Sequence, residues 1–157
     1  MLILGDYTTS LKKALEEIDK DYMKYDALVI AGSHTPKETE YIISKIREYR
    51  EAGKPVYGEC LGHQLCAIEW ARANGIPDAT SEEFGEGTFV VKKRPSLKVG
   101  LHNGESYWNN YEVVIDWEKP KGMFTAQFHA SYQSSIDRPH PLIKSFLNYA
   151  KQKTNEV

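Results

Sequence analysis

The residue best placed to do chemistry in this sequence is Cys60, within Gly58-Glu59-Cys60-Leu61-Gly62. A short apolar segment precedes it and a helix-forming segment follows it, so a strand-to-helix turn is predicted. Glycine two residues before and after is the spacing of a nucleophile elbow, where larger side chains would collide with the turn. The N-terminus of the following helix would favour a thiolate and a developing oxyanion. The pattern indicates a cysteine nucleophile, although a buried cysteine in a tight turn also fits it.

Five histidines are available to supply the base that a thiolate nucleophile needs. They are His34, His63, His102, His129 and His140. His129 ends the last predicted strand, so it would emerge at the same edge of the sheet as Cys60. His63 lies inside the helix after Cys60 and should point away from the line of attack. For every histidine except His129 a solvated or hydrogen-bonded side chain is the simpler interpretation, so His129 is the candidate base.

The elements that must position these residues alternate between strands and helices. Strands are predicted from short apolar runs at Met1–Gly5, Ala27–Ala31, Pro55–Gly58 and Phe124–His129. Helices are predicted over Ser10–Lys24, from Thr35 (N-cap) and Pro36 to Gly53, over Leu61–Ala73 and over Pro141–Ala150. Segments Thr88–Val91, Lys98–Leu101 and Glu112–Ile115 indicate a small β-rich insert. This order predicts one α/β domain over residues 1–157, a three-layer, flavodoxin-like fold with an open, mostly parallel sheet and helices on both faces.

Composition and charge indicate where the protein is expected in the cell and which classes of binding partner are not expected. The 157 residues include 20 Lys+Arg and 22 Asp+Glu, and the net charge of −2 favours neither nucleic acid nor an anionic membrane. No apolar run approaches the roughly 20 residues that span a bilayer, and the start lacks a signal-peptide pattern, so a cytoplasmic protein is expected. No spacing of His, Cys, Asp or Glu suggests a metal, and no cofactor is expected. Cys66 falls on the apolar side of its helix and is predicted to be a core residue.

Three segments together resemble the class I glutamine amidotransferase family. The family's nucleophile segment is similar to residues 54–65, which read Lys-Pro-Val-Tyr-Gly-Glu-Cys-Leu-Gly-His-Gln-Leu. This motif most resembles that of the glutaminase subunits of archaeal GMP synthases. Thr125–His129 is similar to the segment that carries its catalytic histidine. Ala27–Ser33 lies where the family has its oxyanion strand and glycine-rich loop. The resemblance implies a class I glutamine amidotransferase-like fold.

The resemblance also implies roles for particular residues. Cys60 would attack the side-chain amide of glutamine to form a thioester, and His129 would take the thiol proton and return one to the leaving group. The backbone N–H groups of Ser33 and Leu61 would form the oxyanion hole. Contacts to the substrate would come from Gly32 and Gln64. The ammonia would pass to a separate synthase subunit.

The sequence departs from the family at two positions near the triad. The family normally has a glutamate two residues after its histidine, where this chain has Ser131. Before its cysteine the family usually has an aliphatic residue, where this chain has Glu59. Glu59 would oppose thiolate formation if it lay close, or would replace the missing acid near His129, although strand alternation argues against the replacement. Ser131 and Glu59 are the two candidates for a group that orients His129.

Length is a third departure, and it leaves three functions open. Cys60 and His129 are 69 positions apart, shorter than is usual in the family, and a strand expected before Ala27 is missing. The first function is a glutaminase that delivers ammonia to a separate synthase. The second is a cysteine hydrolase that cleaves a γ-glutamyl or related amide without a partner. The third is a non-catalytic binding or regulatory homologue whose triad has decayed.

Overall fold

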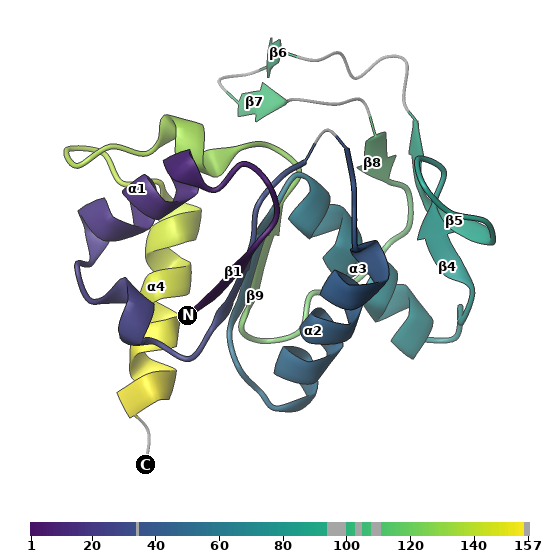
Figure 1. Ribbon diagram of the computed structural model, residues 1–157, viewed down its shortest axis with the longest axis horizontal. Helices are drawn as coiled ribbons and strands as arrows, with labels where there is room; N and C mark the ends of the chain where they lie inside the picture. The colour runs from purple at the N-terminus through teal and green to yellow at the C-terminus, as the bar shows by residue number, and fades with distance from the viewer. Residues whose placement is uncertain (34, 94–99, 103–104, 108–110, 156–157) are drawn as a thin grey trace.

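The computed structural model describes residues 1–33, 35–93, 100–102, 105–107 and 111–155 (Figure 1). Its centre is a four-stranded parallel sheet in the order β1, β2, β3, β9. These strands are Leu2–Leu4, Leu28–Ile30, Val56–Glu59 and Met123–Ala126. The two middle strands, β2 and β3, are buried along their whole length, as expected of strands covered on both faces.

Helices cover both faces of this sheet and form the two outer layers (Figure 1). They are α1 (Thr9–Ile18), α2 (Thr39–Glu51), α3 (Leu61–Ala73) and α4 (Pro141–Asn155), with the 3₁₀ helices η1 (Tyr22–Lys24) and η2 (Ala130–Gln133). Val29 and Tyr57 face α1 and α4, whereas Ile30 and Val56 face α2 and α3. The predicted three-layer α/β fold is confirmed. None of the described helices is long and apolar enough to cross a membrane.

A β-rich insert lies between α3 and β9. β4 (Ala79–Ser81), β5 (Thr88–Lys93) and β8 (Tyr111–Val113) form a three-stranded sheet, and β6 (Gly100–His102) pairs with β7 (Glu105–Tyr107) in an antiparallel ribbon. The insert is predicted from the sequence, but β4 and β7 are not, because three residues are too few to show an alternating pattern. Residues 98 and 99 of one predicted strand lie outside the described residues.

The segment between α1 and β2 differs from the prediction. The helix predicted to reach Lys24 ends at Ile18, because Asp19 has an extended backbone (φ −150°) and η1 follows as a separate turn. In the described chain no strand forms between α1 and β2, in agreement with the missing strand pattern before Ala27. β1 therefore pairs directly with β2 and forms one edge of the sheet.

The predicted start of α2 at Thr35 and Pro36 is wrong. The helix begins at Thr39, and Glu38 before it adopts a left-handed backbone with φ 54°. Thr35, the predicted N-cap, donates its backbone N–H to Ser33 Oγ at 3.2 Å. The Ser33 side chain therefore closes a turn where the helix is predicted to start. The loop after β2 is therefore longer than the capping pattern indicates.

The last strand and helix also end at other residues than predicted. β9 ends at Ala126, so His129 lies beyond the strand rather than at its end, and η2 begins at Ala130. α4 begins at Pro141 as predicted but continues to Asn155. The chain between β9 and α4 thus crosses the carboxyl edge of the sheet before it turns back.

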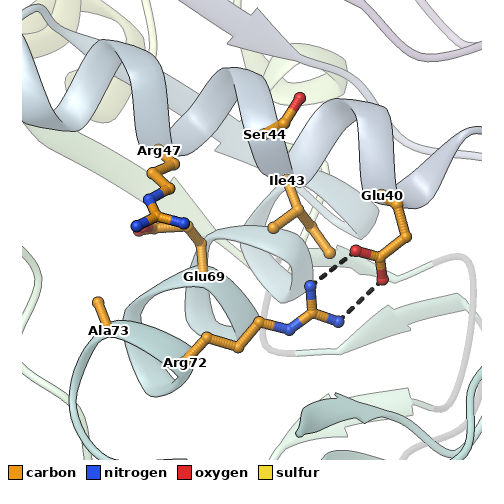
Figure 2. Close-up of a pocket in the computed structure, with 7 residues that line it drawn as sticks. All are labelled: Glu40, Ile43, Ser44, Arg47, Glu69, Arg72 and Ala73. Carbon is orange, nitrogen blue, oxygen red and sulfur yellow. Dashed lines mark hydrogen bonds and ion pairs between the residues drawn. The ribbon is translucent and has the colours of Figure 1, made fainter. Parts of the chain in front are cut away.

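Ion pairs join α2 to α3 on the outer side of the molecule. Figure 2 shows the guanidinium of Arg72 facing the carboxylate of Glu40, with two hydrogen bonds of 2.8 Å. Deeper in the interface, Arg50 donates three hydrogen bonds to Glu69, whose side chain is 3% exposed. Glu40, Glu69 and Arg72 line a pocket of about 210 Å³. Arg72 lies in the last turn of α3, at the opposite end of that helix from Cys60.

Replacing Arg50 with methionine should lower the free energy of unfolding by about 3 kcal/mol, because the buried carboxylate of Glu69 would lose its partner. Arg47→Met is the matched control on the same helix, since Arg47 pairs with Glu51 and the two side chains are 70% and 56% exposed. That change should stay within about 0.5 kcal/mol. Urea unfolding followed by circular dichroism measures both, and equal losses would contradict the prediction.

Candidate active site

Cys60 occupies a strained turn between β3 and α3. Its φ of 56° and ψ of −111° lie where residues other than glycine are rarely found. A Cβ on Gly58 would lie 2.7 Å from the backbone carbon of Gly62, and one on Gly62 would lie 2.4 Å from the carbonyl oxygen of Ile30. Both glycines are therefore needed for steric reasons. The strand-to-helix turn predicted for Cys60 is present, and it has the geometry of a nucleophile elbow.

His129 lies close to Cys60 although it is far away in sequence. It is the N-cap residue of η2, is 1% exposed, and stacks on Tyr132 with 4.7 Å between ring centroids. A Cβ built on Gly32 would lie 3.3 Å from Cys60 Cβ, 2.8 Å from His129 Cε1 and 3.5 Å from His129 Nε2. The absence of a side chain at Gly32 thus leaves room for both groups, and the Cε1–Nε2 edge of the imidazole lies on the side of Cys60.

Glu59 lies on the other side of this imidazole. Its Oε2 is 3.3 Å from His129 Nδ1, and both side chains are buried. The hydroxyl of Tyr57 donates to Oε1 at 2.7 Å. Ser131 donates twice, from its hydroxyl to Oε2 at 2.8 Å and from its backbone N–H to Oε1 at 3.3 Å. The carboxylate is held at both oxygens and faces the ring.

The argument from strand alternation against Glu59 is therefore wrong. Glu59 obeys alternation and faces the same layer as Tyr57, which packs with α1 and α4. His129 reaches that layer too, because η2 packs against α1 and α4. Cys60 has left the strand through its positive φ, so its side chain need not lie opposite to that of Glu59 in the way alternation requires. Alternation thus gives Glu59 the face of the sheet that η2 covers.

Ser33 and Leu61, the residues predicted for the oxyanion hole, line one pocket of about 360 Å³ together with Gly5 and Asp6. Leu61 is the first residue of α3, where a backbone N–H has no acceptor within the helix. The hydroxyl of Ser33 donates to the carboxylate of Asp6 and so holds the loop after β2 against the loop after β1. Ser33 and Leu61 thus lie in the wall of the same pocket.

Gln64 lies one turn into α3 and is fully buried. Its Nε2 donates to the carbonyl of Tyr111 at 3.3 Å and to Gln127 Oε1 at 3.2 Å. Among the described residues, its Oε1 has no hydrogen-bond partner. Gln64 therefore connects α3 to the insert and to the segment after β9, and it leaves a buried acceptor close to Cys60 in the chain.

Of the other histidines, His63 and His140 have described side chains, and their contacts lie elsewhere. His63 Nδ1 is 2.9 Å from Thr125 Oγ1, and burial together with the charge of Lys119 lowers the pKa of His63 to about 3, so its ring is neutral. His140, just before α4, accepts the backbone N–H of Leu142 at its Nδ1. His34 lies outside the described residues. Within the described chain, no group of His, Cys, Asp or Glu is arranged to hold a metal ion.

Several residues that hold the site are not predicted from the sequence. Tyr57 could have been found, because it lies two positions before Glu59 in a strand and must share its face. Tyr132 and Gln127 gave no signal, since their contacts depend on the path of the chain after β9. The link between Asp6 and Ser33 likewise joins two loops that only the sheet brings together.

A strained cysteine at a helix start, an imidazole beside it and a carboxylate behind the imidazole have the arrangement expected of a cysteine-nucleophile site on an α/β fold. The chain belongs to the class I glutamine amidotransferase family, whose family model, described as glutamine amidotransferase class-I, matches residues 5–118. The match includes Cys60, Gln64 and Glu59 and ends before His129, so the case for His129 rests on the geometry.

CTP synthases are among the curated relatives of this chain. That of Thermosipho africanus is 42% identical over 208 residues, which cover 93% of this chain and 40% of that protein. That of Methanoculleus marisnigri is 45% identical over 107 residues, 66% of this chain and 20% of that protein. This chain thus spans less than half the length of these relatives. The resemblance to the family is confirmed. The motif around Cys60 suggests archaeal GMP synthase subunits, whereas these relatives are CTP synthases.

A solved structure supports the fold. The glutaminase domain of Trypanosoma brucei CTPS with bound acivicin matches 99% of this chain and 94% of its own chain, with a TM-score of 0.74 and 18% sequence identity. The stretch aligned with the Thermosipho africanus protein, 208 residues, is longer than the 157 residues of this chain. The relative therefore has segments that this chain lacks, in agreement with the short spacing between Cys60 and His129.

Proposed function

We propose that this chain is a glutaminase that hydrolyses the side-chain amide of glutamine at Cys60 and delivers the ammonia to a synthase. One observation carries the proposal: the buried imidazole of His129 lies between Cys60 and a carboxylate. This is the order of groups that activates a weak nucleophile. The relatives named as CTP synthases, and the glutaminase domain that shares the fold, support the same chemistry.

The reaction uses the two edges of the imidazole. His129 takes the thiol proton at the edge near Cys60, and the thiolate attacks the amide carbon of the substrate. The backbone N–H groups of Leu61 and Ser33 stabilise the oxyanion that forms. The imidazolium gives its proton to the leaving nitrogen, so ammonia departs and a thioester remains. Water, deprotonated by His129, then attacks the thioester and releases glutamate and the Cys60 thiol.

The substrate contacts follow from the polar atoms around the elbow. Gln64 offers a buried acceptor, which suits a donor of the glutamine molecule. Gly32 lets the substrate approach Cys60 and His129, because any side chain there would fill the gap between them. Cys60 and His129 are each 1% exposed, so groups that cover the site must move when glutamine enters.

The partner is a synthase that consumes ammonia. The names of the relatives make a synthase of the CTP synthase type better supported than one of the GMP synthase type. The CTP synthase relatives are more than twice as long as the part of them that this chain matches. The synthase would therefore be formed by residues other than the 157 of this chain. The acceptor substrate is set by that partner.

Ammonia release and covalent trapping test this function together. The purified chain should release ammonia from glutamine in an assay coupled to glutamate dehydrogenase. A glutamine-analogue electrophile should add to Cys60 alone, as located by peptide mass spectrometry, and glutamine should slow the addition. Cys66 is the internal control, because its burial is complete and raises the pKa of its thiol. Neither ammonia above the blank nor a label on Cys60 would instead support a non-catalytic homologue, and faster cleavage of other γ-glutamyl amides would support a hydrolase without a partner.

A further inference from the structure

We propose that Glu59 is the acid of this site, supplied from the nucleophile strand instead of from the position two residues after His129, and that Tyr57 and Ser131 hold it in place. The inference rests on the proposed function, because it assigns the third group of the same site. Glu59 is a positioning residue: it touches His129 and not the substrate.

Hydrogen-bond donors surround the buried carboxylate of Glu59 and stabilise its negative charge. A buried carboxylate is costly unless it is hydrogen-bonded, and Glu59 is 1% exposed. It receives three donors, one from Tyr57 and two from Ser131. Burial, followed by the charge of Glu59, raises the pKa of Tyr57 well above its usual value, so the Tyr57 hydroxyl keeps its proton and stays a donor. The remaining contact of the carboxylate is His129 Nδ1.

This contact gives the imidazole its direction. A proton on Nδ1, which lies 3.3 Å from Glu59 Oε2, would leave the lone pair on Nε2 to take the thiol proton on the side of Cys60. When the imidazolium forms, the carboxylate 3.3 Å away stabilises its charge. Because the ring lies between Glu59 and Cys60, the carboxylate favours the thiolate–imidazolium pair more than it repels the thiolate.

The two departures from the family pattern compensate each other. Ser131 stands where the family has its glutamate, and Glu59 stands where the family usually has an aliphatic residue. Ser131 Oγ is 2.8 Å from the oxygen of Glu59 that faces the imidazole, so both positions reach the same place. A glutamate at 131 would meet a second carboxylate there, whereas serine supplies a donor. The site thus keeps one carboxylate and changes only the element that carries it.

A reciprocal exchange tests this arrangement. The chains are native, Glu59→Leu, Ser131→Glu and the double variant Glu59→Leu/Ser131→Glu, with kcat/KM for glutamine as the readout. Glu59→Leu should lose about 10³-fold, since the acid is missing. Ser131→Glu should lose at least about tenfold, because two carboxylates share one site. The double variant should recover to within about tenfold of native, which is far above the product of the two single losses.

Smaller changes separate the charge of Glu59 from its packing. Glu59→Gln keeps the shape and hydrogen-bonding reach but not the charge, and should lose nearly as much as Glu59→Leu. Tyr57→Phe removes one donor while the ring can keep its packing on Phe146, whose centroid is 5.4 Å away, and should lose about tenfold or less. Thermal melts confirm that each variant is folded. If Glu59→Gln retains native kcat/KM, the inference is overturned.

Alkylation of Cys60 by iodoacetamide distinguishes this inference from the proposed function, because it reports thiolate formation without glutamine. At neutral pH, the native chain and the double variant should be alkylated fast. Glu59→Leu and Glu59→Gln should be alkylated more slowly than the native chain, by about tenfold or more. That order in a chain that does not hydrolyse glutamine would support Glu59 and contradict the glutaminase function. Equal alkylation rates in native and Glu59→Gln, or a double variant no better than Glu59→Leu, would overturn the role of Glu59.

Discussion

Replacing Cys60 with alanine should reduce ammonia release from glutamine by about 10⁴-fold or more, to the level of the blank. No other described thiol is placed to form the thioester, since Cys66 is the only other cysteine and lies buried in α3. The change removes one sulfur and keeps a side chain that fits the turn, whose φ of 56° the chain already tolerates in a residue other than glycine. The rate is measured by the coupled ammonia assay at saturating glutamine.

Cys66→Ala is the matched control for this experiment. It removes the same atom from a cysteine inside α3, the helix that follows Cys60, at a position that is fully buried and away from the elbow. It should cost roughly 1 kcal/mol of stability through a small cavity and leave the rate of ammonia release near native. Ammonia release that survives in Cys60→Ala but not in Cys66→Ala would place the chemistry elsewhere and contradict the proposed function.

His129→Gln should lower kcat for glutamine hydrolysis by about 10³-fold, because general base and acid catalysis at both proton transfers would be lost. Glutamine is close in size to histidine, and its amide can donate to Glu59, so the buried carboxylate keeps a partner. The fold should therefore survive, and the loss should appear in kcat rather than in binding. Alkylation of Cys60 should slow in parallel, since the thiolate loses its imidazolium.

His63→Gln provides the same substitution on the other side of the elbow. His63 is three residues after Cys60, nearer in sequence than His129, but it contacts Thr125 and its ring is neutral. A glutamine there can keep the hydrogen bond to Thr125, and kcat should stay within about twofold of native. If His63→Gln abolished hydrolysis and His129→Gln did not, the assignment of the base would be reversed.

Two departures from the family pattern that would each be unfavourable alone lie in contact with one another. Ser131 alone removes the charge that stabilises the imidazolium, and Glu59 alone adds a charge beside the nucleophile. In the fold, the serine hydroxyl binds the new carboxylate and the carboxylate faces the imidazole. A search for the acid at one fixed position after the histidine would classify this chain as decayed. The spatial arrangement supports an intact triad.

Features that depend mainly on residues close together in the chain can be predicted from the sequence alone. Gly58 and Gly62 around Cys60 predict the elbow, because the collisions they avoid occur within the turn and with the adjacent strand β2. The bounds of α3, Leu61–Ala73, are predicted correctly from apolar spacing and from the Asn-Gly that ends it. The buried run of β2 predicts a strand covered on both faces.

Which carboxylate lies beside His129 depends on the tertiary structure. Glu59 and His129 are far apart in sequence, and they meet because β3 and β9 are neighbours in the sheet and because η2 packs over the layer that Glu59 faces. Strand alternation states which face a side chain takes but not which distant segment covers that face. The turn at Cys60 depends mainly on local steric contacts. The contact between Glu59 and His129 depends on how distant segments pack, and the spacing of residues along the chain does not predict that packing.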